Sequence, residues 1–82
     1  MPTMQVKKVI ERVKDFPGLG ERIKAARMAD KRSLSKICKE WGISRAYWYQ
    51  LEDEDMRAPA TIEMIRKIEQ ALGVDLGVQF DD

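Results

Sequence analysis

Histidine is absent from this sequence, and cysteine occurs once, as Cys38. The missing histidines exclude catalysis by an imidazole base and any metal site built on imidazole ligands. A single cysteine cannot form a disulfide within the chain or assemble a cysteine-rich zinc site, and it gives no reason to expect an oxidising compartment. We therefore expect a reducing, cytoplasmic location, with Cys38 packed as a small apolar side chain.

Long apolar runs are also missing, and the chain is short. No stretch approaches the roughly 20 apolar residues that a membrane span needs, and residues 1–15 carry too many charges for a signal peptide. With 82 residues, one small domain with a modest core is expected. No nucleophile stands with a base, and the acidic run 52–55 lacks the pattern of a calcium loop. The sequence therefore predicts no enzyme, no cofactor and no metal site.

Charge of both signs is plentiful but unevenly distributed. The first 45 residues hold 12 Lys and Arg against 5 Asp and Glu, whereas residues 46–82 hold 3 against 9. The net charge of +1 therefore conceals a basic half near +7 and an acidic half near −6. A basic half provides an electrostatic surface for phosphate, while an acidic half faces away from nucleic acid or meets a protein partner.

Apolar residues at helical spacing begin at Gly18 and mark four segments. They predict helices over residues 18–29, 33–41, 44–52 and 61–72, with a polar break at 30–32. Ser33, Ser44 and Thr61 are suitable N-caps for the last three. Gly42 is well placed to end the second helix, so the second and third helices are joined by a tight turn. This arrangement is a helix-turn-helix.

The two ends of the chain follow a different pattern. In residues 74–80 the apolar side chains occupy every even position, which predicts a β-strand with one buried face. Residues 5–13 are rich in β-branched side chains and could pair with that strand, although their apolar residues also fit helical spacing. Phe16, Pro17 and Gly18 predict a turn into the first helix. The expected organisation is an N-terminal arm at 1–17, a helical domain at 18–73 and a C-terminal strand or tail at 74–82.

At about 100° per residue, the third predicted helix has two different faces. Trp48 and Leu51 fall on an inward arc, with Tyr47 at its edge. The opposite arc carries four side chains that suit contact with bases: Arg45, Ala46, Tyr49 and Gln50. Arginine can donate a fork to guanine, glutamine can pair with adenine, and a small alanine lets the helix approach a thymine methyl. At the start of the second helix, Ser33, Ser35 and Lys36 lie near free backbone N–H groups and are expected to bind phosphate.

Residues 33–52, SLSKICKEWGISRAYWYQLE, resemble the helix-turn-helix of the Cro and lambda-repressor-like domains, also called the XRE family. The resemblance covers about residues 19–74. It implies a mainly α, lambda-repressor-like bundle of four to five helices that binds operator DNA, usually as a dimer on paired half-sites. By position it also implies backbone contacts from Ser33, Lys36 and Tyr47. Arg27 and Glu52 resemble the family's ion pair between the first helix and the recognition helix, which we expect to be structural.

The chain departs from the family pattern around the recognition helix. Leu34 replaces a glutamine that contacts phosphate in many members, so Ser33 or Ser35 makes that contact or it is absent. Glu54 replaces a common glycine, and the acidic run 52–55 would repel phosphate, which leaves Arg57 as the phosphate candidate of the loop. The predicted DNA backbone contacts are Ser33, Ser35, Lys36, Ser44, Tyr47 and Arg57.

Together these features predict a cytoplasmic transcriptional regulator that binds double-stranded DNA with residues 44–52 in the major groove. A homodimer is expected, and the strand at 74–80 would pair within the chain or between two copies. The alternative is a protein-interaction module, antitoxin-like or adaptor, that uses the same fold and docks a protein through its acidic C-terminal half.

Overall fold

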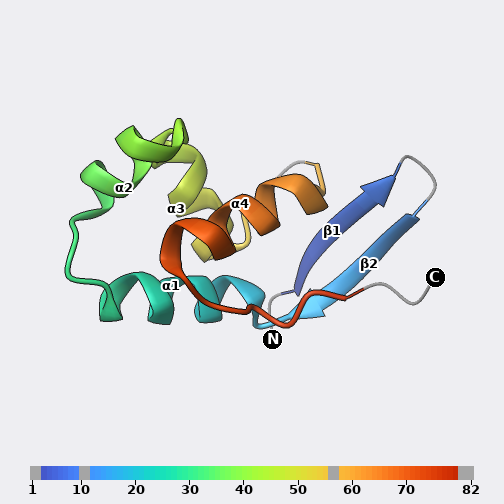
Figure 1. Ribbon diagram of the computed structural model, residues 1–82. Coiled ribbons are helices and arrows are strands. Elements are labelled where there is room, and N and C mark those ends of the chain that lie inside the picture. Colours follow the sequence, from blue (N-terminus) through green and yellow to red (C-terminus); the bar gives the residue numbers. More distant parts are fainter. Residues whose placement is uncertain (1–2, 10–11, 56–57, 80–82) are drawn as a thin grey trace.

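The computed structural model describes residues 3–9, 12–55 and 58–79. In these ranges the chain forms four helices and a three-stranded mixed sheet. The fold is therefore α+β, and the prediction of a mainly α bundle with a C-terminal strand is wrong. Figure 1 shows the N-terminal hairpin at one end of the molecule, with the helices gathered beside it.

The helices lie where spacing and cap residues predict them, to within one residue at each end. They are α1 (Leu19–Ala29), α2 (Leu34–Trp41), α3 (Arg45–Asp53) and α4 (Ile62–Leu72). Ser33, Ser44 and Thr61 each accept a hydrogen bond from the backbone N–H three residues later, at 3.2, 3.0 and 3.2 Å. These bonds satisfy donors that a helix start otherwise leaves free. None of the four described helices is long and apolar enough to cross a membrane.

The N-terminal arm forms a β-hairpin. Strand β1 (Thr3–Val9) pairs antiparallel with β2 (Arg12–Pro17), and Met4 lies opposite Phe16 with both side chains buried. The helical alternative for residues 5–13 is therefore wrong in the described part of that range. Of the turn predicted over Phe16, Pro17 and Gly18, only Gly18 forms the turn, because β2 continues through Phe16 and Pro17. Pro17 ends an edge strand, where its missing N–H removes no hydrogen bond from the ladder.

The partner of β1 on its other side is a short segment just before α4. Strand β3 (Ala60–Thr61) runs parallel to β1, with Val6 opposite Ala60, so β1 is the central strand of the order β2-β1-β3. Both Val6 and Ala60 are buried. The pairing therefore ties the N-terminus of the chain to the start of α4.

Residues 74–79 are extended but join no strand, so the strand predicted over 74–80 is wrong for its described part; Phe80 lies outside the described residues. Gly77 has a φ of 74°, outside the range of a regular strand, and its N–H donates to Asp75 Oδ1 at 2.8 Å. The N–H of Leu76 donates to Glu69 Oε2 at 2.7 Å. The alternating apolar residues that predicted a strand do mark buried positions, since Leu76 and Val78 are buried. The backbone of the segment, however, bonds to side chains and not to a neighbouring strand.

The C-terminal segment, residues 74–79, is held mainly by α4. Arg66 Nη2 donates to the carbonyl oxygen of Val78 at 2.6 Å, and Arg66 Nη1 donates to Glu69 Oε1 at 2.8 Å. Lys14 Nζ of β2 donates to the carbonyl oxygen of Gln79 at 3.4 Å. The segment thus fastens α4 to the hairpin, and Figure 1 shows it running from the end of α4 past α1 toward β2.

One core joins all of these elements. Its largest fully buried side chains come from the hairpin, the four helices and the C-terminal segment: Met4, Val6, Leu19, Ile23, Ile37, Trp48, Leu51, Ile65, Ile68 and Val78. Cys38 belongs to the same core, and burial raises the pKa of its thiol. The helix-turn-helix therefore rests on a core to which the hairpin also contributes.

Candidate nucleic-acid interface

The turn between α2 and α3 fixes how the two helices present their exposed sides. Gly42 ends α2 with a φ of 66°, a left-handed conformation that glycine adopts at little cost. The N–H of Ile43 then donates to the carbonyl oxygen of Cys38 at 3.0 Å, and the buried Ile43 side chain anchors the turn. Ser44 begins α3 directly afterwards, so three residues separate the two helices.

The exposed face of α3 carries all four predicted base contacts. Arg45, Ala46, Tyr49 and Gln50 are exposed, and their spacing places them on one arc of the helix. On the opposite side, Trp48 and Leu51 are completely buried. The helix is therefore anchored through one face and presents an arginine, a small side chain, an aromatic ring and an amide on the other.

Arg45 is tied to α2 across the turn. Its Nη1 donates to Ser35 Oγ at 3.2 Å, which brings the first turns of α2 and α3 side by side. Among the described residues, the Nε–H and both Nη2–H donors of this guanidinium have no hydrogen-bond partner, so they can serve a ligand. Sequence spacing alone did not indicate this contact, because it depends on how the two helices cross.

The predicted backbone contacts have different surroundings. Ser33 and Ser44 already cap their helices, Ser35 accepts from Arg45, and Lys36 is exposed on the first turn of α2. Tyr47 is partly buried, and this burial raises the pKa of its phenol, which is therefore neutral near pH 7. Arg57 lies outside the described residues.

Behind the exposed face, a buried network holds α3 against α1. Arg27 donates from Nε to Glu52 Oε2 and from Nη2 to Glu52 Oε1, the latter at 3.0 Å. Trp48 Nε1 also donates to Glu52 Oε2, at 2.7 Å. The hydrogen bond to Glu52 raises the pKa of Arg27, so the guanidinium stays charged. The predicted pair forms, and Glu52, with only 3% of its side chain exposed, is satisfied on both oxygens.

Arg27 also contacts the exposed face of α3. Its guanidinium carbon lies 5.8 Å from the centroid of the Tyr49 ring, a distance typical of a cation–π interaction. One arginine thus connects a buried carboxylate to an exposed aromatic ring. The sequence predicted the ion pair but not the ring contact.

A close approach between α1 and the end of α3 was also missed. The N–H of Gly20 donates to Glu54 Oε1 at 2.8 Å, and a Cβ at Gly20 would lie 2.7 Å from the carbonyl oxygen of Leu51. Glu54 ends α3 with a φ of 54°, the left-handed conformation for which a glycine is common at this position. The Glu54 side chain therefore accepts a hydrogen bond from the first turn of α1.

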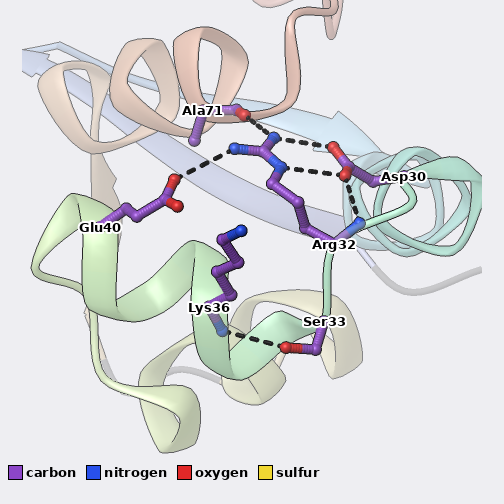
Figure 2. Close-up of polar contacts among 6 residues, drawn as sticks. All are labelled: Asp30, Arg32, Ser33, Lys36, Glu40 and Ala71. Atoms are coloured by element: carbon purple, nitrogen blue, oxygen red, sulfur yellow. Dashed lines mark hydrogen bonds and ion pairs between the residues drawn. The ribbon is translucent and has the colours of Figure 1, made fainter.

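Arg32, in the break between α1 and α2, joins three elements (Figure 2). Its Nε and Nη2 donate to the Asp30 carboxylate at 3.0 and 2.8 Å, Nη2 also donates to the carbonyl oxygen of Ala71, and Nη1 lies 3.4 Å from Glu40 Oε2. The hydrogen bonds from Arg32 lower the pKa of Asp30 to about 2. Arg32 is therefore engaged within the protein, which leaves Lys36 and Arg45 as the cations exposed at the start of α2 and α3.

The opposite end of α3 is acidic. A cavity of about 240 Å³ between the start of α1 and the end of α3 is lined by Gly18, Glu21, Lys24, Glu52, Asp53 and Glu54. These carboxylates, together with the negative end of the α3 dipole, disfavour phosphate there. Within the described residues, no group of three or more cysteine or acidic side chains is arranged to hold a metal ion.

Comparison with known proteins gives no relative from which a role could be transferred. No protein-family model matches the chain, and neither a curated protein nor a solved structure matches it significantly. The resemblance of residues 33–52 to the XRE family therefore stays a prediction, and the assignment of function depends on the residues described above.

Proposed function

We propose that this protein binds double-stranded DNA in a sequence-specific manner, with α3 in the major groove, and regulates transcription in the cytoplasm. The observation that carries the proposal is the exposed face of α3. Arg45 and Gln50 offer the bidentate chemistry that distinguishes guanine and adenine, and Ala46 leaves room for the helix to approach the base edges. Trp48 and Leu51, buried on the other side, hold this face in a fixed orientation.

The start of α2 supports the same proposal by offering phosphate contacts beside the groove-facing residues. Ser35 touches Arg45, so the first turn of α2 adjoins the base-contacting face. Lys36 is exposed on that turn, where free N–H groups and the positive end of the helix dipole favour an anion. The acidic end of α3 would point away from the phosphates in this orientation.

A homodimer is part of the proposal, because two linked copies would place two recognition helices about 34 Å apart, one turn of DNA. The expected binding site is then a palindrome. This prediction is checked by sedimentation of the protein alone and with a selected duplex.

The decisive experiment is selection from a random duplex pool with the full chain, at about 50 and 200 mM salt, because phosphate contacts weaken steeply over this range. We expect a short motif to be enriched. Failure of a folded sample to enrich any motif at either salt would contradict the proposal and would favour the protein-interaction module, to be pursued by partner capture.

Arg45→Ala should lower affinity for the selected duplex by roughly 1–3 kcal/mol and relax the preference at one base pair.

Lys36→Ala should instead weaken binding to all duplexes similarly and reduce the dependence of binding on salt by about one phosphate contact. Gln50→Ala should likewise lose the motif, because it removes an amide that can pair with adenine. Gln70→Ala, at an exposed position of α4, is its matched control and should leave the motif unchanged. Fluorescence anisotropy measures all four variants.

A further inference from the structure

Tyr49 is the exposed aromatic ring of the interface, and a side chain of α1 contacts this ring. About 48% of the residue is exposed, yet the Arg27 guanidinium lies 5.8 Å from its ring centroid. Arg27 is in turn fixed by two hydrogen bonds to Glu52, whose Oε2 also accepts from the buried Trp48. A chain of contacts therefore runs from the core to the ring.

These contacts limit which ligands Arg27 itself can bind. Its Nε and Nη2 both donate to Glu52, and the carboxylate offsets its charge, so Arg27 is poorly suited to bind a phosphate. Its guanidinium also contacts the Tyr49 ring. The arrangement suits a positioning role, in which Arg27 limits the orientations of Tyr49 before any ligand arrives.

The exposed part of the ring indicates the chemistry of its ligand. Because Arg27 lies over one face of the ring, its apolar edge, its hydroxyl and its other face are left for a ligand. Bases in a duplex are stacked on each other and offer no face to a side chain in the major groove, but thymine projects its C5-methyl group there. An apolar ring edge at that position gains by covering the methyl.

We propose that Tyr49 selects a thymine by contact with its methyl group, and that Arg27 is the positioning residue that makes the contact selective. This inference rests on the proposed function, since it names the group that one part of the interface recognises. It differs from a general stacking role, because stacking on single-stranded bases would be indifferent to a methyl group.

The test replaces thymine by uracil, one position at a time, in the duplex selected by the full chain. This change removes a single methyl group and leaves every Watson–Crick hydrogen bond in place. With the wild type, we expect uracil at one position to weaken binding about fourfold, the effect of losing one buried methyl. With Tyr49→Ala, the same replacement should have no effect.

Three further variants distinguish the contribution of the Tyr49 ring from those of its hydroxyl and of neighbouring side chains. Tyr49→Phe should keep the uracil effect, because it keeps the ring, whereas a contact made by the hydroxyl would be lost. Arg27→Lys keeps a cation but not the fork, and should reduce the effect to below about twofold even where its affinity for other duplexes is retained. Gln70→Ala, at an exposed position of α4 outside the interface, should keep the full effect.

Because Arg27→Lys could disturb folding, the positioning role has a second measurement in the protein without DNA. The Tyr49 ring should shift the NMR resonances of the Arg27 side chain, and Tyr49→Ala should remove that shift. Identical Arg27 resonances in both proteins would overturn the positioning role.

The remaining outcomes distinguish this inference from the proposed function. A wild type that selects a motif but tolerates uracil at every position, or a Tyr49→Ala variant that retains the effect, would overturn the thymine contact alone. A wild type that selects no motif would overturn the proposed function and this inference with it.

Discussion

Asp30 is the residue whose protonation bears most directly on the packing of α1, α2 and α4. Arg32 lowers its pKa from 3.8 to about 2, and the same guanidinium reaches Ala71 on α4. A carboxylate with a depressed pKa in the folded state stabilises the protein fully above its unfolded pKa. That contribution should be lost as pH falls from about 4 to about 2.

Urea unfolding of wild type and Asp30→Asn at several pH values checks this prediction. The variant should be less stable near neutral pH and should lose less stability on acidification, so that the two curves converge at low pH. Asp53→Asn, which removes an exposed carboxylate, should follow the wild type. Parallel curves for wild type and Asp30→Asn would show that the Arg32 contact does not couple to folding.

Gly20 should resist substitution despite its position inside a helix. In an exposed helix, Gly→Ala stabilises by about 1 kcal/mol, because alanine has the higher helix propensity. Here the added methyl would meet the backbone oxygens of Leu51 and Glu52, so Gly20→Ala should destabilise the protein by roughly 1–3 kcal/mol. Ala25→Gly, at an exposed position of the same helix, is the control and should cost about 1 kcal/mol. A stabilising Gly20→Ala would contradict the close approach of α1 and α3.

At the scale of elements, the C-terminal segment offers a test in which the sign of the change in stability distinguishes a strand from the observed conformation. A glycine inside a strand weakens it, so Gly77→Ala would stabilise a strand. In the observed conformation, with a φ of 74°, Gly77→Ala should instead destabilise by about 1 kcal/mol. Gly77→Asn should cost less, because asparagine tolerates this conformation better. Thermal unfolding of the three proteins gives the order of stability.

The helices were predictable because their signals are local. Ser33, Ser44 and Thr61 bond to N–H groups three residues away, and apolar spacing within each segment marks its buried side. The C-terminal segment was not predictable in the same way, because alternation reports which side chains are buried and not what the backbone pairs with. Two of its backbone partners, Arg66 and Glu69, belong to α4, and a third, Lys14, belongs to β2.

In the candidate interface, too, the predictable features are those with a local signal in the sequence. Which face of α3 is exposed follows from helical geometry, and the ion pair of Arg27 with Glu52 was expected from a family resemblance. The contacts of Arg45 with Ser35 and of Arg27 with Tyr49 depend on how neighbouring helices cross. Such contacts are properties of the packed molecule, and a single sequence carries no local signal for them.

At the scale of the whole molecule, the position of α3 depends on elements far from it in sequence. The hairpin contributes Met4, Val6 and Phe16 to the core that also contains Trp48. Strand β3 then connects the hairpin to the start of α4. The N-terminal arm therefore helps to support the interface, and loss of its packing should destabilise α3.

This dependence predicts that the chain unfolds as one unit. Met4→Ala, at a completely buried position of β1, should cost roughly 2–5 kcal/mol, whereas Gln5→Ala, on the exposed side of the same strand, should stay within about 0.5 kcal/mol of the wild type. In a Trp41→Phe background, the fluorescence of Trp48 reports on α3 alone, while circular dichroism reports on every helix. Both signals should shift together in Met4→Ala, because a hairpin that shares the core cannot loosen without it. A fluorescence transition that stayed in place while the hairpin loosened would mean that the helices fold without β1, and that the N-terminal arm could be removed without disturbing α3.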